Sequence, residues 1–168
     1  ATCNYQARKF GIRKGMFLGR AKKLSPELVV LKYDFEGYQQ VSGMVDDILQ
    51  RYAQEYQGVV EKVSCDESFL EIFVPQTHDG VPVVLSIAER IRQDIVDATE
   101  CTATIGVANN KFLSKLASDQ VKPNQSLVVE DHKELLKGLN LRDLHGIGYR
   151  SEPKLQEKGL TTVQDVMG

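Results

Sequence analysis

Hydrophobic and polar residues recur along the middle of the chain with the spacings of helices and strands. Apolar residues at every third or fourth position predict a long helix from about Phe35 to Tyr56, capped by Asp34, and a second helix that opens at Pro82. Between them, residues 59–74 are typical of two short strands, because Val, Phe and Ile dominate on both sides of a polar turn. The pattern then predicts a strand, a helix and a strand, over residues 102–107, 111–120 and 126–129.

The apolar stripe of each predicted helix indicates the face that packs inward. For the three helices these residues are, in turn, Tyr38, Val41, Val45, Ile48, Leu49 and Tyr52; Val84, Ile87, Ile91 and Ile95; and Phe112, Leu113 and Leu116. The order helix-β-β-helix-β-helix-β lacks only an initial strand to give a ferredoxin-like β-α-β-β-α-β sheet, with one further helix inserted. We therefore expect an α+β fold that contains a partial ferredoxin-like sheet, mixed or antiparallel.

The two ends of the chain differ from this central region. Up to about Asp34 the sequence predicts short helices broken by Gly11, Gly15 and Gly19. The polar stretch Gln76–Gly80 is expected to be a connection, and from about Glu130 the chain turns helical. These changes of pattern predict three parts, with the bounds 1–34, 35–129 and 130–168.

Composition and charge narrow the function classes. The 168 residues are 42% hydrophobic and 26% charged, which is ordinary for a soluble globular protein, and no apolar run approaches the length of a membrane span. The three cysteines, Cys3, Cys65 and Cys101, indicate neither a disulfide framework nor a zinc site, so a reducing intracellular compartment fits best. The start of the chain lacks an initiator Met and a signal-peptide pattern, from which we expect a fragment.

Positive charge is concentrated at the start of the chain. Residues 1–32 carry a net charge of +7 and the remainder −9, although the whole chain carries only −2. Such a basic end suggests a polyanionic partner, such as nucleic acid or a triphosphate. A solvated helical face would give the same composition.

The adjacent acids Asp66 and Glu67 lie between two apolar strands. Ionised carboxylates resist leaving water unless a positive charge compensates them, and hard oxygen ligands favour Mg²⁺ or Mn²⁺. Because neighbouring residues of a flat strand point to opposite faces, a shared metal site requires a turn or bulge here. The alternative is a solvated Asp-Glu hairpin turn without a metal.

Two further groups of residues suggest binding of phosphates. Tyr5 and Arg8 would share one helical face, where a guanidinium fork and a phenol suit a triphosphate, and Thr2 could add a hydroxyl. Lys122 is held by the following Pro123 and could supply a point charge. Each of these residues could equally be an ordinary surface position.

Residues 144–160 are similar to a helix-hairpin-helix. Gly146 and Gly148 would free backbone amides to face a DNA phosphate, which grips the backbone without reading sequence. Pro153 fits only in the first turn of the second helix of this hairpin. A packing hairpin between helices is the alternative.

Taken together, these motifs resemble the Y-family translesion DNA polymerases. Residues 1–16 (ATCNYQARKFGIRKGM) resemble the nucleotide-binding fingers of that family, and residues 64–70 (SCDESFL) resemble its palm signature. Residues 104–124 (TIGVANNKFLSKLASDQVKPN) resemble its third signature, and the Gly-Ile-Gly hairpin resembles its thumb. The three predicted parts would then be a partial fingers domain, a palm without its first strand, and a partial thumb.

The resemblance implies a role for each candidate residue. Asp66 and Glu67 would be catalytic ligands of two Mg²⁺ ions, or of Mn²⁺, and Gly146 and Gly148 would grip primer-template DNA. The triphosphate contacts would be Tyr5, Arg8, Lys122 and, more weakly, Thr2. The implied reaction transfers a deoxynucleotide from a dNTP to a primer 3′-hydroxyl opposite damaged template. Other replication or repair proteins are expected partners, a membrane is not, and the expected location is the nucleus, or the nucleoid or cytoplasm of a prokaryote.

Smaller features bear on the branch of the family. Cys65, Gly-Met-Phe at 15–17 and Tyr-Asp-Phe at 33–35 resemble the deoxycytidyl-transferase branch, which would make dCTP the substrate. The alternatives are a bypass polymerase of the DinB-like branch, a non-catalytic DNA-binding or scaffold module with a relic palm, and a cyclase-like palm enzyme. The family's first metal-binding Asp, its steric gate and its little-finger domain would lie outside this chain, so we expect the chain alone to be inactive.

Overall fold

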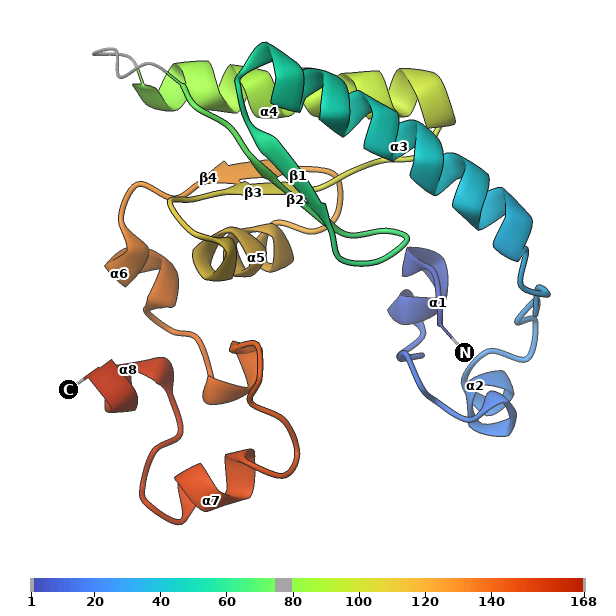
Figure 1. Cartoon of the computed structure of the whole chain (residues 1–168). Helices are drawn as coiled ribbons and strands as arrows, with labels where there is room; N and C mark the ends of the chain where they lie inside the picture. The colour runs from blue at the N-terminus through green and yellow to red at the C-terminus, as the bar shows by residue number, and fades with distance from the viewer. Residues whose placement is uncertain (1, 75–79, 168) are drawn as a thin grey trace. The chain divides into compact units, whose positions relative to one another are not determined.

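The computed structural model describes residues 2–74 and 80–167 and divides the chain into two compact units, 1–35 and 36–168 (Figure 1). Helices and short strands are mixed in it, and the predicted α+β class is confirmed. The predicted connection Gln76–Gly80 lies outside the described residues except for Gly80, where a helix begins.

The first unit holds two short helices, α1 (Tyr5–Lys9) and α2 (Leu18–Leu24). The side chain of Asn4 caps α1 by accepting a hydrogen bond from the backbone amide of Ala7 at 2.9 Å. The small core of this unit consists of the buried residues Ala7, Ile12 and Ala21. Cys3, Met16 and Leu28 pack against this core.

Two of the three glycines expected to interrupt the helices of this unit do so. Gly11 and Gly15 have φ values of +80° and +81°, in the left-handed region that favours glycine. The prediction was wrong for Gly19, which lies inside α2. A glycine in a helix costs only about 1 kcal/mol relative to alanine, and Ala21, two positions on, is buried in the core of the unit.

Two long helices and the strands form the main core of the second unit. Helix α3 (Phe35–Glu55) and helix α4 (Gly80–Thr99) follow the predicted stripes closely. The core that they share is centred on the buried residues Tyr52, Ile87, Ile91 and Ile95, and the residues that pack against it include Val45, Ile48, Leu49, Leu70, Ile72 and Ile105. Tyr38 was wrongly predicted to face inward; it is 46% exposed because it lies in the first turn of α3, before the turns that pack on this core.

The strands form two separate pairs within the described residues. Strands β1 (Val59–Lys62) and β2 (Ser68–Glu71) pair antiparallel, and β3 (Ile105–Val107) and β4 (Ser126–Val128) pair parallel. The connection between the parallel strands is helix α5 (Lys111–Gln120), as a parallel pair requires a crossover. The predicted partial ferredoxin-like sheet is thus present as two halves rather than as one ladder.

Helix α5 packs closely on β3, and Gly106 permits the approach. A Cβ atom at this position would lie 2.1 Å from the carbonyl oxygen of Ser114 and 2.4 Å from the amide nitrogen of Ser118. Leu113 and Leu116 face inward as predicted. The prediction was wrong for Phe112, which is 43% exposed in the first turn of the helix.

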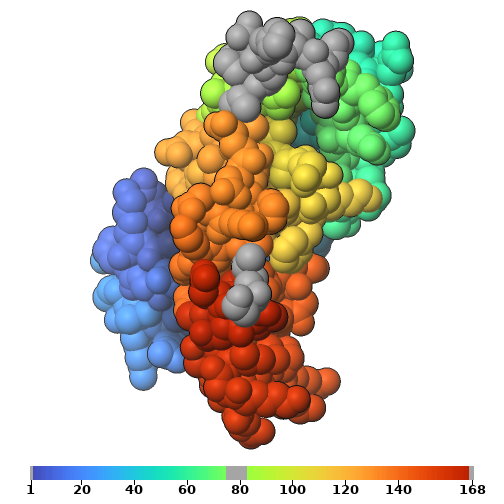
Figure 2. Space-filling model, turned by 90° about the vertical axis from the view of Figure 1, so that its left-hand side faces the viewer, coloured from blue at the N-terminus to red at the C-terminus, as the bar shows by residue number. Residues whose placement is uncertain are grey.

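Residues 130–167, the C-terminal segment, contain only short helices. These are α6 (His132–Leu136), the 3₁₀-helix η1 (Leu141–Asp143), α7 (Glu152–Gln156) and α8 (Val163–Met167). Leu116 of α5 joins Leu139, Leu141 and Val163 in one core, and the segment forms a continuous body in Figure 2. Among the described residues, none of the helices has the length and apolar character needed to cross a membrane.

Candidate functional site

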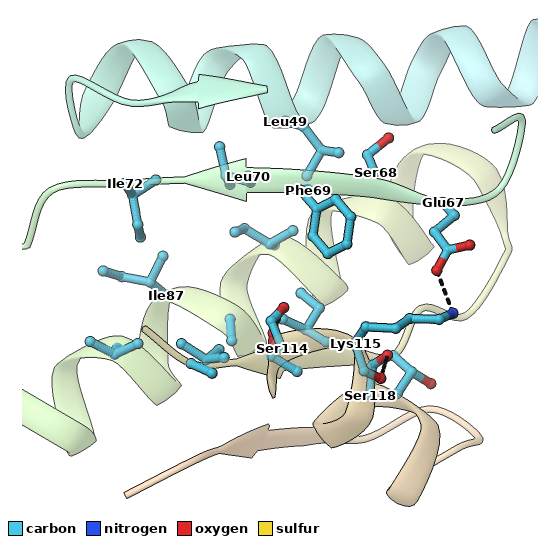
Figure 3. A pocket seen from close by; sticks show the side chains of 18 of the residues that line it. Leu49, Glu67, Ser68, Phe69, Leu70, Ile72, Ile87, Ser114, Lys115 and Ser118 are labelled. Carbon is cyan, nitrogen blue, oxygen red and sulfur yellow. Dashed lines mark hydrogen bonds and ion pairs between the residues drawn. The ribbon is translucent and has the colours of Figure 1, made fainter. Parts of the chain in front are cut away.

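A groove of about 290 Å³ opens in the second unit between the β1–β2 hairpin and the β3–α5 region (Figure 3). Apolar side chains line the end away from Glu67, among them Ile87 of α4 and Ile72, which directly follows β2. Charged side chains gather at the other end, where Glu67 faces Lys115. The groove therefore has an apolar end and an ionic end.

The acidic pair lies in the turn between β1 and β2. The carbonyl oxygen of Glu67 accepts hydrogen bonds from the amides of Val63 at 2.9 Å and Ser64 at 3.0 Å, which close this turn. The Ser64 hydroxyl donates to Oδ1 of Asp66 at 2.8 Å. Because the chain turns here, Asp66 and Glu67 both line the groove, which a flat strand would not allow.

Four alternating charges connect the acidic turn to Lys122. The Lys115 ammonium pairs with Glu67 and lies 3.6 Å from Oδ1 of Asp119. The same Asp119 oxygen lies 2.6 Å from Nζ of Lys122. We call the series Glu67–Lys115–Asp119–Lys122 the charge chain. It neutralises its own members and holds both lysines at the ionic end of the groove.

Lys115 is the most enclosed member of the charge chain, with 25% of its side chain exposed. Burial alone would lower the pKa of its ammonium. The hydrogen bond that the ammonium donates to Glu67 and the charges of Asp119 and Glu67 outweigh burial and raise this pKa above its ordinary value. Lys115 is therefore a fixed positive charge beside the acidic turn at neutral pH.

The donors of the acidic turn fit a divalent cation in kind. Carboxylate oxygens are the ligands that Mg²⁺ and Mn²⁺ prefer, and Asp66 and Glu67 supply them side by side. One oxygen of Glu67 is occupied by Lys115, and one oxygen of Asp66 by Ser64. Within residues 2–74 and 80–167, no group of three or more His, Cys, Asp and Glu side chains could hold a metal ion, so this pair offers two protein ligands.

Three of the four predicted phosphate contacts, Thr2, Tyr5 and Arg8, lie in the first unit. On α1, the guanidinium carbon of Arg8 lies 4.9 Å from the centroid of the Tyr5 ring, so the two side chains share one face as expected. Nε of Arg8 donates to the carbonyl oxygen of Cys3 at 3.3 Å, and the Tyr5 side chain is 47% exposed. Thr2 is also exposed. Lys122 belongs to the second unit.

The Gly-Ile-Gly sequence forms a turn between η1 and α7. Gly146 has a φ of +96°, which explains a glycine at that position. A Cβ at Gly148 would meet no atom within 4 Å, and its amide donates to the Ser151 hydroxyl at 3.2 Å. Pro153 lies in the first turn of α7, as predicted. The elements flanking this turn are a 3₁₀-helix of three residues and an α-helix of five.

Two members of the charge chain escaped the sequence prediction. Lys115 and Asp119 are four residues apart on α5, and Asp119 and Lys122 three apart, which are spacings at which side chains on a helix meet. That signal was available in the sequence. The pairing of Lys115 with Glu67 joins distant parts of the chain and had no local signal.

Comparison with known proteins identifies the family. Residues 1–119 match the model of the impB/mucB/samB family. The chain belongs to this family. The predicted resemblance to the Y-family translesion polymerases is thereby confirmed, since impB/mucB/samB proteins and their structural relatives are polymerases of that kind.

The relatives of this impB/mucB/samB protein come from two branches. It is 37% identical over 169 residues to the DNA repair protein Rev1 of Drosophila melanogaster, covering 99% of the chain and 16% of that protein. It is 39% identical over 168 residues to DNA polymerase IV of Shewanella oneidensis, covering 99% of the chain and 45% of that protein. The chain thus spans less than half the length of either relative.

The solved structures point to the DinB-like branch. A DinB family error-prone DNA polymerase from Sulfolobus solfataricus superposes with a TM-score of 0.82 at 28% identity, covering 99% of the chain and 49% of that structure. Together with the DNA polymerase IV relatives, this match supports the DinB-like alternative better than the deoxycytidyl-transferase branch that we first favoured.

Proposed function

We propose that the protein containing this chain is a Y-family translesion DNA polymerase that transfers deoxynucleotides from a dNTP to a primer 3′-hydroxyl. The observation that carries the proposal is the ionic end of the groove, where two adjacent carboxylates and two lysines meet. Transfer of a nucleotidyl group requires positioned positive charge around phosphates more than it requires covalent chemistry. Membership of the impB/mucB/samB family supports the same reaction.

In this proposal each candidate residue binds or orients a substrate. Asp66 and Glu67 would hold Mg²⁺ or Mn²⁺, which would supply charge neutralisation at the reacting oxygens. Lys122 would exchange its contact with Asp119 for a phosphate oxygen of the nucleotide. In the first unit, Tyr5 and Arg8, with Thr2, are the proposed triphosphate contacts. Gly146 and Gly148 would lie against the backbone of primer-template DNA.

The finer expectations also remain proposals. Residues 1–34, 35–129 and 130–168 would be partial fingers, palm and thumb, and the chain alone would be inactive. Use of dCTP in preference to other nucleotides would place the protein in the deoxycytidyl-transferase branch, and templated use of all four would place it in the DinB-like branch. The relatives include a fly protein and a bacterial one, so they do not favour the nucleus over a bacterial cytoplasm.

Primer extension by the full-length protein, with each dNTP separately, tests this proposal. We expect Asp66→Ala and Glu67→Ala each to lower the rate by about 10²–10³-fold, the cost of removing one electrostatic partner of the transition state. Glu61→Ala is a matched control, because Glu61 is an exposed acid on β1 whose carboxylate pairs with Lys111. Full activity in the Asp66→Ala/Glu67→Ala double variant would refute the site. Binding of primer-template DNA without any extension by the wild type would favour the scaffold alternative.

A further inference from the structure

Arg92 of α4 is an enclosed cation that none of the sequence patterns singled out. Only 13% of its side chain is exposed. Its Nε donates to the carbonyl oxygen of Ala103 at 3.0 Å, and its Nη2 donates to both the backbone and the side-chain oxygen of Asn124, each at 2.5 Å. Its Nη1 donates to Glu89 at 2.6 Å. Four of the five guanidinium donors thus have a partner.

Two of these hydrogen bonds hold a single turn residue, Asn124, in place. Asn124 lies between α5 and β4 with a φ of +55°, a conformation that is uncommon for residues other than glycine and that persists where its surroundings hold it. Its amide donates to the Thr104 hydroxyl at 2.9 Å. The amide, the carbonyl and the side chain of Asn124 are therefore all held, two of them by Arg92.

Lys122 lies two residues before Asn124, and Pro123 between them restricts the backbone. The Lys122 ammonium ends a flexible side chain of four rotatable bonds, so its position depends on where the backbone carries it. We infer that Arg92 is a positioning residue for Lys122: by clamping Asn124 it holds the 122–124 turn so that Lys122 stays at the ionic end of the groove. This inference rests on the proposed function, in which Lys122 contacts the triphosphate of the incoming nucleotide.

The inference predicts a specific kinetic effect of Arg92→Met in the full-length protein. Loss of the clamp leaves the lysine present but misplaced, so binding of the nucleotide weakens. We expect the KM for dNTP in primer extension to rise about tenfold while kcat changes less than threefold, the pattern of lost uniform binding. Arg90→Met is the matched control on the same helix, because Arg90 is exposed and pairs with Glu55 at 3.6 Å; its KM is expected to stay at the wild-type value.

A double-variant cycle separates positioning from a merely structural role. If Arg92 acts through Lys122, the Arg92→Met/Lys122→Met double variant has a KM within about twofold of Lys122→Met alone, because the clamp has nothing left to position. The inference is overturned if the KM of the double variant rises by the product of the two single-variant increases. It is also overturned if the KM of Arg92→Met is unchanged. An unchanged KM in Lys122→Met refutes the triphosphate role of Lys122 and the inference with it, while extension activity itself still tests the proposed reaction.

Asn124→Gly keeps the test decisive if Arg92→Met does not fold. Glycine accepts the positive φ and retains the backbone carbonyl, but it removes the side-chain oxygen that Arg92 holds. We expect a rise in KM of about threefold that disappears in the background of Lys122→Met. The same KM as wild type would overturn the inference.

Discussion

Replacing Lys115 by Met removes the cation that compensates Glu67 in the charge chain. The Met side chain has a similar length and keeps the apolar contacts of the lysine stem, so the change isolates the charge. Glu67 would then face the groove without its partner, next to the second carboxylate of Asp66. We expect the variant to be less stable than the wild type, and Glu67→Gln to reverse part of that loss.

The magnitude follows from how far the pair is removed from water. Exposed ion pairs couple by about 0.2–1 kcal/mol, and breaking a fully buried pair costs about 3–5 kcal/mol. Lys115 is 25% exposed and Glu67 37%, which places the pair between these limits, near the exposed one after screening by solvent. We expect a coupling energy of about 1 kcal/mol, and a loss of about 1.5 kcal/mol in Lys115→Met, equivalent to a fall in Tm of about 3–6 °C.

A double-mutant cycle over Lys115→Met and Glu67→Gln, measured by urea unfolding, gives the coupling energy directly. The chain offers a matched control in Lys111 and Glu61, which also join α5 to the hairpin but have side chains that are 60% and 57% exposed. We expect about 0.3 kcal/mol for the control pair. A coupling at the Lys115–Glu67 pair no larger than that of the control would show that Lys115 does not compensate the acidic turn.

Two further predictions concern the C-terminal segment. In Gly148→Ala, the added methyl group would meet no atom of the chain within 4 Å, so we expect a stability within about 0.5 kcal/mol of wild type. We expect about tenfold weaker binding of primer-template duplex, measured by fluorescence anisotropy at fixed salt. Unchanged affinity would contradict a DNA contact at this position. Asp165 accepts hydrogen bonds from Thr161 and Thr162, which lower its pKa from 3.8 to about 2. Because the pKa is lowered only in the folded state, this stabilisation is complete above pH 4 and is lost as the pH falls toward 2. The difference in stability between wild type and Asp165→Ala should therefore shrink between pH 4 and pH 2, which acid unfolding followed by circular dichroism would measure.

Local patterns predicted the helices well because their signals lie within one turn. The predicted helix over 111–120 coincides with α5 at both ends. At its start, the Asn110 side chain caps the first turn by accepting a hydrogen bond from the Leu113 amide at 2.9 Å. The stripe of Ile87, Ile91 and Ile95 is buried as expected. The strands were less well bounded: β3 begins at Ile105 rather than 102, since a strand of three residues contains too little alternation to fix its start.

The contacts that define the groove could not be predicted in the same way, because they join residues far apart in the chain. Arg92 and Asn124 are separated by 32 positions, and no local spacing relates them. The exposure of Tyr38 likewise depends on which turns of α3 pack on the main core, which periodicity does not specify. Residue types and turns indicated the acidic pair and Lys122, whereas the pairing of Lys115 with Glu67 emerges only from tertiary packing.

Helix α5 connects the groove of the second unit to the C-terminal segment. Lys115 lies on its groove side, while the neighbouring Leu116 is 3% exposed in the core shared with the C-terminal segment. The backbone of this helix also contacts Gly106 of β3 so closely that a methyl group would not fit. A helix held on one side by β3 and on another by the leucine core has little freedom to shift. The charges of the groove are therefore fixed by packing on both sides of α5, and the C-terminal segment contributes to their position without lining the acidic turn.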